Sequence, residues 1–362
     1  MERVFNFSAG PSMLPMEVLE QAQRDLICYP GAGCSVMEMS HRSKSFEDIR
    51  DRAEATLRRI MNIPEDYAVL FLQGGASTQF SAIPMNLAHQ GDTTAYAVTG
   101  QFAGKALDEA KRWGNAVTVA TSKPDNFTYI PKITPDMIPT DAKYLHITGN
   151  NTIFGTTYNT LPQVGDTPLV ADWSSAILGK VIDVKKHALI YAGAQKNMGP
   201  AGLTVVIVKK DVILPEVDAV VPKMLRYAPM IENDSMYNTP PCWAIYVAGL
   251  VYEWVERSGG VEAMEERNTK KAALLYDLID NSKVFNNPAA KEDRSIMNVT
   301  FTLPTQEDTD AFIALAKANN IINIKGHRSV GGCRASIYNG MPLEGVETLA
   351  KLMRDFENGA RA

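Results

Sequence analysis

Short apolar runs alternate with longer amphipathic stretches over most of the chain. The runs are four to six residues long, rich in β-branched residues and bounded by turn-forming residues, which is typical of buried strands. In the stretches that separate the early runs, apolar residues recur at helical spacing. This pattern predicts an α/β fold in which helices cover both faces of a mainly parallel sheet. The predicted strands are 68–72, 95–99, 116–120, 144–148, 169–172, 189–192 and 203–208.

The pattern changes at a Ser-Gly-Gly turn (258–260), which we expect to separate two domains. We predict an N-terminal arm (1–15) and a large domain (16–258), followed by a small C-terminal α+β domain (259–362). A chain of 362 residues, 45% of them hydrophobic, is long enough for both cores. Predicted elements of the small domain include helices 261–281, 307–318 and 343–358 and strands 297–303 and 334–338.

One lysine lies between two predicted buried strands. Lys196 is part of the small-residue turn 193–197, which follows the run ending at 192 and precedes the run starting at 202. Burial lowers the pKa of a lysine and so favours the neutral, nucleophilic amine. The small neighbours leave room for a bulky group. Although most lysines are solvated on the surface, this one is a candidate for covalent attachment of an aldehyde.

A lone carboxylate, Asp172, ends another apolar run upstream of Lys196. Taken alone, such a residue is more often a cap or a turn residue. Pyridoxal phosphate, however, needs a lysine for its aldehyde and an acid beside its ring nitrogen, so that the ring can withdraw electrons. The two residues together, in a chain of alternating strands and helices, predict a pyridoxal-phosphate enzyme.

Two further segments carry residues that can bind anions. Residues 73–78 place two glycines after a strand and Ser and Thr at a helix start, which can form a phosphate cradle or a plain connector. Residues 325–334 hold three basic side chains and a histidine among glycines, by default a solvated loop. Arg334 begins a predicted strand, where a buried cation needs a partner.

These segments resemble the phosphoserine aminotransferase family, a class V, fold-type I group of pyridoxal-phosphate-dependent aminotransferases. The resemblance runs from residues 5–11 (FNFSAGP) to 341–346 (MPLEGV). It implies reversible amino transfer between O-phospho-L-serine and 2-oxoglutarate, giving 3-phosphohydroxypyruvate and L-glutamate in a ping-pong cycle of L-serine biosynthesis. Whether phosphohydroxythreonine, in pyridoxine biosynthesis, is a second substrate stays open.

The resemblance also implies roles for individual residues. Lys196 and Asp172 are the catalytic pair, Arg334 clamps the substrate α-carboxylate, and His327 and Arg328 bind the substrate phosphate. Four of these residues would act in the partner's site, which implies a homodimer with shared active sites: His41, Arg42, Asn238 and Thr239. The implied cofactor-binding residues are Gly75, Ala76, Phe102, Thr152, Asp172, Gln195, Lys196, Asn238 and Thr239, and the implied substrate-binding residues are His41, Arg42, His327, Arg328 and Arg334.

Two positions depart from the family pattern. Some relatives carry an arginine where this chain has Ala76, so the substrate anion has one donor fewer here. Relatives often have tryptophan at the position of Phe102, which keeps the aromatic face for the cofactor ring with less area.

Composition limits the remaining classes of function. A net charge of −5 gives no basic footprint for nucleic acid, so an anionic substrate must be attracted by a local cluster of cations. No apolar window is long enough to cross a membrane, and the first five residues lack the core of a signal peptide. The four cysteines show neither metal-binding spacing nor a disulfide framework. We therefore expect a cytoplasmic protein without a metal.

Two alternatives remain. Another class V activity, cysteine desulfurase, needs a nucleophilic cysteine on a mobile loop. Cys333 precedes Arg334 in an apparent strand, so their side chains would point to opposite faces. A pyridoxal-phosphate-binding regulator would carry an added DNA-binding module, for which this chain has neither spare length nor basic charge.

Overall fold

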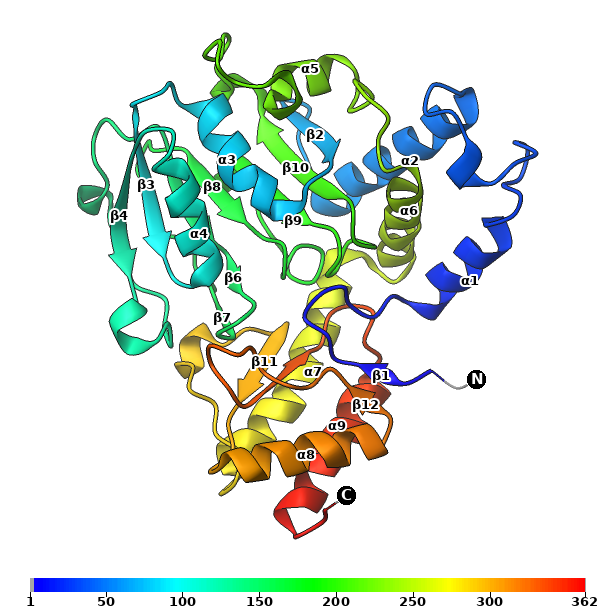
Figure 1. Ribbon diagram of the computed structural model, residues 1–362, viewed down its shortest axis with the longest axis vertical. Coiled ribbons are helices and arrows are strands. Elements are labelled where there is room, and N and C mark those ends of the chain that lie inside the picture. The colour runs from blue at the N-terminus through cyan, green and yellow to red at the C-terminus, as the bar shows by residue number, and fades with distance from the viewer. Residues whose placement is uncertain (1–2, 362) are drawn as a thin grey trace.

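The computed structural model describes residues 3–361. The described chain contains the predicted sheet, whose seven strands lie in the order β2-β10-β9-β8-β5-β3-β4 (Figure 1). The four pairings from β9 to β4 are parallel, and β10 is antiparallel to both of its neighbours. The prediction of a mainly parallel sheet is confirmed. The strands are β2 (Tyr67–Leu72), β3 (Thr93–Val98), β4 (Asn115–Thr121), β5 (Leu145–Thr148), β8 (Leu169–Asp172), β9 (Leu189–Gly193) and β10 (Thr204–Lys209).

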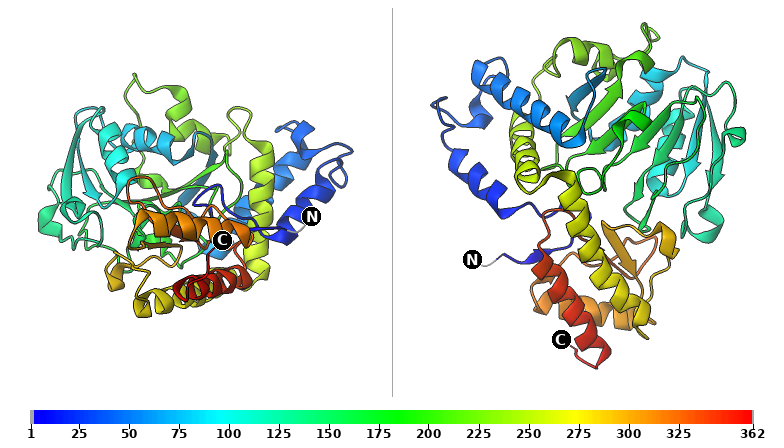
Figure 2. Two further views of the ribbon diagram at one scale, coloured as in Figure 1. Left: turned by 60° about the horizontal axis from the view of Figure 1, so that its bottom comes forward. Right: turned by 180° about the vertical axis from the view of Figure 1, so that it is seen from behind.

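Alternate side chains of the strands pack against two helix layers, one on each face of the sheet (Figures 1 and 2). Tyr191 and Val206 belong to the core under α3, α4 and α5, whereas Ala192 and Ile207 belong to the core under α2 and α6. Because both faces of these strands are buried, they read in the sequence as continuous apolar runs and not as an alternation of apolar and polar residues. The helices are α1 (Met16–Asp25), α2 (Lys44–Met61), α3 (Gly75–Leu87), α4 (Gln101–Ala110), α5 (Tyr227–Glu232) and α6 (Cys242–Arg257).

The carboxyl ends of the parallel strands meet at one edge of the sheet, which is where ligands bind in open α/β folds. Asp172 ends β8, and α3 and α4 begin just after β2 and β3. A short hairpin of β6 (Asn150–Asn151) and β7 (Thr156–Thr157) follows β5. Because β9 and β10 are antiparallel neighbours, the connection that carries Lys196 spans this same edge.

The C-terminal third of the chain has a separate aromatic core. Phe285, Phe301, Phe312 and Phe356 contact one another with ring centroids 5.3–6.1 Å apart. This core is consistent with a small domain, but the proposed domain boundaries stay a prediction. Its elements are α7 (Gly260–Asn281), β11 (Asn298–Phe301), α8 (Gln306–Ala318), β13 (Cys333–Ser336) and α9 (Leu343–Glu357).

The strand predicted at 334–338 was placed too far along the chain, because β13 ends at Ser336. The carbonyl oxygens of Ile337 and Tyr338 do not continue the ladder. Both accept hydrogen bonds from Nζ of Lys271, a buried lysine on α7, at 2.9 Å. The sequence pattern could not show that a distant lysine would take these acceptors.

The N-terminal arm crosses the molecule and joins both cores (Figure 1). Its strand β1 (Phe5–Asn6) pairs in parallel with β12 (Ile321–Ile322). Further along the arm, the backbone N–H of Ser12 donates to the carbonyl of Gln195 at 2.9 Å, and the Ser12 hydroxyl donates to the carbonyl of Lys196. The arm therefore holds the lysine-bearing connection from the side opposite the sheet ladder.

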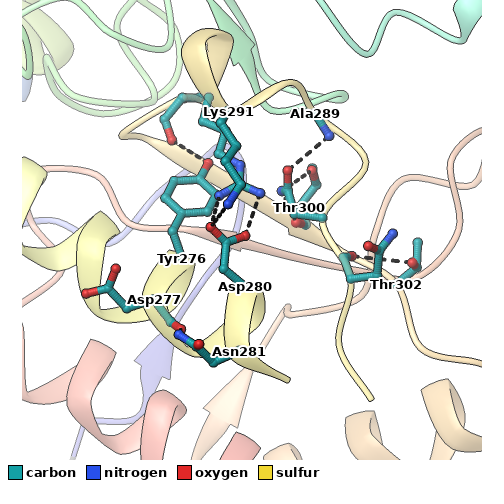
Figure 3. A network of polar contacts seen from close by, with 12 residues as sticks. Tyr276, Asp277, Asp280, Asn281, Ala289, Lys291, Thr300 and Thr302 are labelled. Carbon is teal, nitrogen blue, oxygen red and sulfur yellow. Dashed lines mark hydrogen bonds and ion pairs between the residues drawn. The ribbon is translucent and has the colours of Figure 1, made fainter. Parts of the chain in front are cut away.

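A charged network fastens the end of α7 to the segment before β11 (Figure 3). Arg294 donates to both carboxylate oxygens of Asp280, at 3.0 and 2.8 Å, and its guanidinium lies 4.7 Å from the ring centroid of Tyr276. Lys291 adds an ion pair to Asp280 at 2.9 Å. Hydrogen bonding from Arg294, followed by that from Lys291, lowers the pKa of Asp280 to about 2 although partial burial opposes the shift.

We predict that the Asp280→Asn substitution destabilises the protein by about 1 kcal/mol at pH 7, as expected for a partly exposed ion pair. Because the folded-state pKa lies below the ordinary value of 3.8, this stabilisation is present above pH 4 and is lost as the pH falls toward 2. Denaturant unfolding at pH 7, 4 and 2.5 would measure the difference between variant and wild type.

The matched control is Glu266→Gln, which removes an exposed i,i+4 pair with Lys270 and should leave the stability nearly unchanged at every pH. A difference between Asp280→Asn and wild type that stayed the same at pH 2.5 and pH 7 would contradict the assignment.

Candidate functional site

The Lys196 amine lies at the edge of the sheet, in a desolvated position. Its Nζ donates a hydrogen bond to Thr152 Oγ1 at 2.8 Å. Burial lowers its pKa to about 8, with the positive charge of Arg334 adding to the shift and the negative charge of Asp172 opposing it. A substantial fraction of this amine is therefore neutral at mildly alkaline pH, as a nucleophile requires.

Asp172 is buried at the end of β8. One of its oxygens accepts a hydrogen bond from the backbone N–H of Ser174 at 2.9 Å. Burial raises the pKa of Asp172, and the charge of Lys196 opposes that rise. Within residues 3–361 the two side chains form no ion pair, so Asp172 acts on Lys196 through its charge and not through a direct contact.

Two more predicted residues lie near the Lys196 amine. The Lys196 Nζ lies 5.6 Å from the ring centroid of Phe102, at the start of α4. Thr152, which accepts from Lys196, donates its own hydroxyl to Ser175 Oγ at 2.9 Å. Phe102 thus offers an aromatic face, and Thr152 a fixed hydroxyl, beside the amine.

The start of α3 has the geometry of an anion site. Gly74 and Gly75 both have positive φ, at 90° and 68°, and no side chain caps the helix. A Cβ on Gly74 would lie 2.0 Å from Thr78 Oγ1, so the turn requires glycine there. The first turn also contains no acidic residue. Its backbone N–H groups at Gly75 and Ala76, together with the helix dipole, favour a phosphate.

Arg334 brings a cation from β13 to this site. Its Nη1 donates to the carbonyl oxygen of Thr152 at 3.3 Å, while its buried Nε has no partner in the part of the chain that the structure describes. Burial lowers the pKa of Arg334 as well. A buried donor without an acceptor is costly, so this side chain is suited to an anionic ligand.

The loop before β13 supplies the two other residues predicted to bind the distal anion. His327 is half-buried, and its Nδ1 lies 2.7 Å from Ser329 Oγ, whereas Arg328 is exposed. Burial and then the charges of Arg334 and Arg328 lower the pKa of His327, which places the three side chains near one another. Hydrogen bonds, a ring contact and charge effects thus link Lys196, Thr152, Phe102, Asp172 and Arg334, and the charge of Arg334 also acts on His327. Arg328 is exposed on the same loop, and its side chain forms no hydrogen bond or ion pair within residues 3–361.

Four predicted residues are not brought to this site by their own chain. His41 and Arg42 precede α2, and the Nε2 of His41 is buried without a partner among residues 3–361. Asn238 and Thr239 lie beside the turn before α3, where Gln73 Nε2 donates to the Thr239 carbonyl at 3.1 Å. Within the described chain none of the four forms a hydrogen bond or ion pair with Lys196, Asp172 or Arg334.

Sequence reasoning missed several residues that hold the site together. Ser175 accepts from Thr152 and donates to the Asn150 carbonyl at 3.0 Å, and Ser12 binds the Lys196 carbonyl. The sequence did contain a signal for Ser175. The pair Ser174-Ser175 follows closely after the buried strand that ends at Asp172, so its hydroxyl groups are expected in the interior. For Ser12 there was none, since its partner is distant in the sequence. Gln195, which was predicted, contributes its backbone carbonyl to Ser12 and packs its side chain beside Gly10.

The cysteine considered for a desulfurase is unsuited to that role. Cys333 is buried, and burial raises the pKa of its thiol to about 12. A thiol that stays protonated is a poor nucleophile.

Neither a metal nor a membrane is indicated by the described residues. Between residues 3 and 361 no cluster of three or more His, Cys, Asp or Glu side chains could hold a metal ion. None of the helices there is long and apolar enough to cross a membrane.

The donor set fits pyridoxal phosphate. A partly neutral lysine amine suits its aldehyde, a buried carboxylate suits its ring nitrogen, and an aromatic face lies beside the amine. The uncapped, glycine-rich start of α3 suits its phosphate.

Comparison with known proteins agrees with this donor set. The family model described as "Aminotransferase class-V" matches residues 4–349. Phosphoserine aminotransferase of Listeria monocytogenes serotype 4b (strain F2365) is 54% identical over 363 residues, which cover 100% of this chain and 98% of the relative. A phosphoserine aminotransferase structure from Bacillus circulans subsp. alkalophilus is 44% identical, with a TM-score of 0.95 and 99% of both chains covered. The PLP-bound phosphoserine aminotransferase from Trichomonas vaginalis is 37% identical, with a TM-score of 0.93, covering 97% of this chain and 100% of its own.

We predict that pyridoxal phosphate attaches to the cofactor-free protein at a rate that rises with pH through a midpoint near 8, because the neutral Lys196 amine reacts. Borohydride reduction followed by peptide mapping should find the label on Lys196. Lys271 is an internal control, since its pKa is also lowered, to about 7, but its Nζ is occupied by three carbonyl oxygens. A label on Lys271, or an unchanged label in Lys196→Ala, would contradict the assignment.

Proposed function

Because this chain belongs to aminotransferase class V and, within it, to the phosphoserine aminotransferase family, we propose that it reversibly transfers an amino group between O-phospho-L-serine and 2-oxoglutarate. The products are 3-phosphohydroxypyruvate and L-glutamate, and the role is in L-serine biosynthesis in the cytoplasm. Two groups carry this proposal. The Lys196 amine is desolvated, and the buried Nε of Arg334 has no hydrogen-bond acceptor within residues 3–361.

Pyridoxal phosphate, when bound, supplies a protonated ring that draws electrons from the substrate's α-carbon. Lys196 Nζ would hold its aldehyde, and the Asp172 carboxylate would keep the proton on its ring nitrogen. The N–H groups of Gly75 and Ala76 would bind its phosphate, and Phe102 would stack on its ring. Thr152, already bonded to Lys196 at 2.8 Å, would place its hydroxyl beside the ring.

When its amine does not hold the cofactor, Lys196 would serve as a base. Its lowered pKa, about 8 in the cofactor-free protein, would let the amine take up and return a proton at the substrate's α-carbon near neutral pH. Arg334 would bind the α-carboxylate through two parallel N–H groups, including its presently unpaired Nε. That clamp fixes the α-carbon near the amine, which lowers the entropic cost of proton transfer.

The remaining predicted residues fit a homodimer. His41, Arg42, Asn238 and Thr239 make no contact with their own Lys196, and His41 has a buried nitrogen without a partner among the described residues. We propose that these four residues complete the partner's site. We also propose that each subunit consists of an N-terminal arm (1–15), a large domain (16–258) and a small domain (259–362). Phosphohydroxythreonine carries the same phosphate and amino acid groups, so it is the second substrate to assay.

The test is to supply the cofactor-loaded protein with 2-oxoglutarate and measure glutamate formation from phosphoserine, with alanine as the uncharged comparison. We expect kcat/KM for phosphoserine to exceed that for alanine by about 100-fold or more, because at least one charged hydrogen bond serves only the distal anion. Faster release of sulfide from cysteine than of glutamate from phosphoserine would contradict the proposal.

We predict that the two arginines divide the recognition of substrate. Arg334→Ala should lower kcat/KM about 10- to 100-fold for phosphoserine, glutamate and alanine alike, since all carry an α-carboxylate. Arg328→Ala should lower it for phosphoserine and glutamate and leave alanine nearly unchanged. Arg257→Ala, at an exposed arginine at the end of α6, is the control and should change none of them. An equal loss on every substrate in Arg328→Ala would refute this division.

We predict that the active sites are shared. Mixing the inactive Lys196→Ala chain with the inactive Arg42→Ala chain should restore about a quarter of wild-type activity, because half of the randomly exchanged dimers hold one intact site of two. Native mass spectrometry would establish subunit exchange. If exchange occurred without recovery of activity, Arg42 would act within its own chain.

A further inference from the structure

Lys105 is an exposed cation on α4 that no carboxylate neutralises. Within residues 3–361 it has no ion pair. Glu109, one turn further along the helix, could have paired with it, but Glu109 instead contacts Arg112 at 3.4 Å and accepts from Ser81 at 3.2 Å. Glu–Lys pairs at this spacing are common on exposed helices. The charge of Lys105 is therefore available to something else.

The position of Lys105 is fixed by Phe102, one helical turn earlier. Its Nζ lies 5.5 Å from the Phe102 ring centroid, and the Nζ of Lys196 lies 5.6 Å from the same centroid. The two amines are thus neighbours of one ring. Since α4 begins at the carboxyl edge of the sheet (Figure 1) and the two amines share one ring, Lys105 belongs to the surroundings of the site described above.

Lys105 also lies within electrostatic range of the loop before β13. Burial and then the charges of Arg334, Arg328 and, last, Lys105 lower the pKa of His327. Ala76, at the start of α3, contributes no charge of its own.

We propose that Lys105 is a further specificity-determining residue, which binds the distal anionic group of the substrate opposite His327 and Arg328. This inference rests on the proposed function. The α-carboxylate is assigned to the half-buried Arg334, so the distal group is left for the more exposed cations around the site, of which Lys105 is one. A lysine has three N–H donors on a flexible stem, so it can reach either a phosphate or the shorter γ-carboxylate of glutamate.

The test compares Lys105→Gln, Lys105→Arg and the control Lys111→Gln in the cofactor-loaded enzyme. Lys111 ends the same helix, is exposed and has no ion pair in the described chain, so its replacement removes the same charge. Lys105→Gln should lower kcat/KM for phosphoserine about three- to tenfold through KM, as expected for a partly solvated charge contact, with a smaller loss for glutamate. Alanine should react unchanged, and Lys105→Arg should stay within about twofold of wild type.

A second measurement is independent of the chemistry. Inorganic phosphate should inhibit the reaction of alanine competitively, and its inhibition constant should rise in Lys105→Gln but not in Lys111→Gln. Equal effects in these two variants would mean that only net charge matters. A parallel loss with alanine would mean that Lys105 acts by supporting Phe102. Either result would overturn the proposal, and so would an inhibition constant for phosphate that is unchanged in Lys105→Gln.

The same data separate this inference from the proposed function. A wild-type enzyme that used glutamate but not phosphoserine would refute the phosphoserine assignment. In that case the ratio of kcat/KM for glutamate to kcat/KM for alanine would still decide whether Lys105 binds a distal anion. A lower ratio in Lys105→Gln than in wild type supports the inference, and an unchanged ratio overturns it.

Discussion

Desolvation of one lysine amine is the constraint on which the rest of this structure depends. Lys196 keeps a pKa of about 8 because burial outweighs the attraction of Asp172, and a direct ion pair would cancel that effect. The amine is instead held by a neutral acceptor, the Thr152 hydroxyl, at 2.8 Å. The backbone of the connection is fixed from the other side by Ser12. An amine that must stay partly neutral thus requires uncharged hydrogen-bond partners, and the fold brings these partners from segments far apart in the sequence.

The same connection is joined to the C-terminal third of the chain, so the Lys196 amine and the Arg334 guanidinium are placed relative to each other. Next to the lysine, Asn197 accepts a hydrogen bond from the backbone N–H of Asn339 at 3.0 Å, and Asn268 on α7 donates to Asn339 at 2.8 Å. Arg334 in turn reaches the Thr152 carbonyl. These buried polar contacts are costly to leave unpaired, so they resist relative movement of the two parts.

Local patterns in the sequence were enough for the sheet and for the catalytic pair, but not for the contacts that hold them. Helices α7 and α8 were predicted to within one residue of their observed bounds, because the helical spacing of apolar positions is a local signal. Asp172 and Lys196 were also marked locally, as charges at the ends of buried strands. Ser12, Lys271 and Lys105 were not, because each depends on where the backbone brings a distant partner. Lys105 in particular has the sequence context of an ordinary solvated lysine.

The charge distribution explains how a protein with a net charge of −5 can select an anion. Elsewhere on the surface, some cations are paired with carboxylates one turn away, such as Lys44 with Asp48 and Arg58 with Glu54. Around the site, Arg328 and Arg334 have no carboxylate partner within residues 3–361. Unmatched like charges repel one another, and that cost is relieved only when a ligand supplies the negative charge. An amino acid without a distal anion leaves part of the repulsion in place, so the preference for phosphoserine begins in the empty site, before any contact with the substrate is formed.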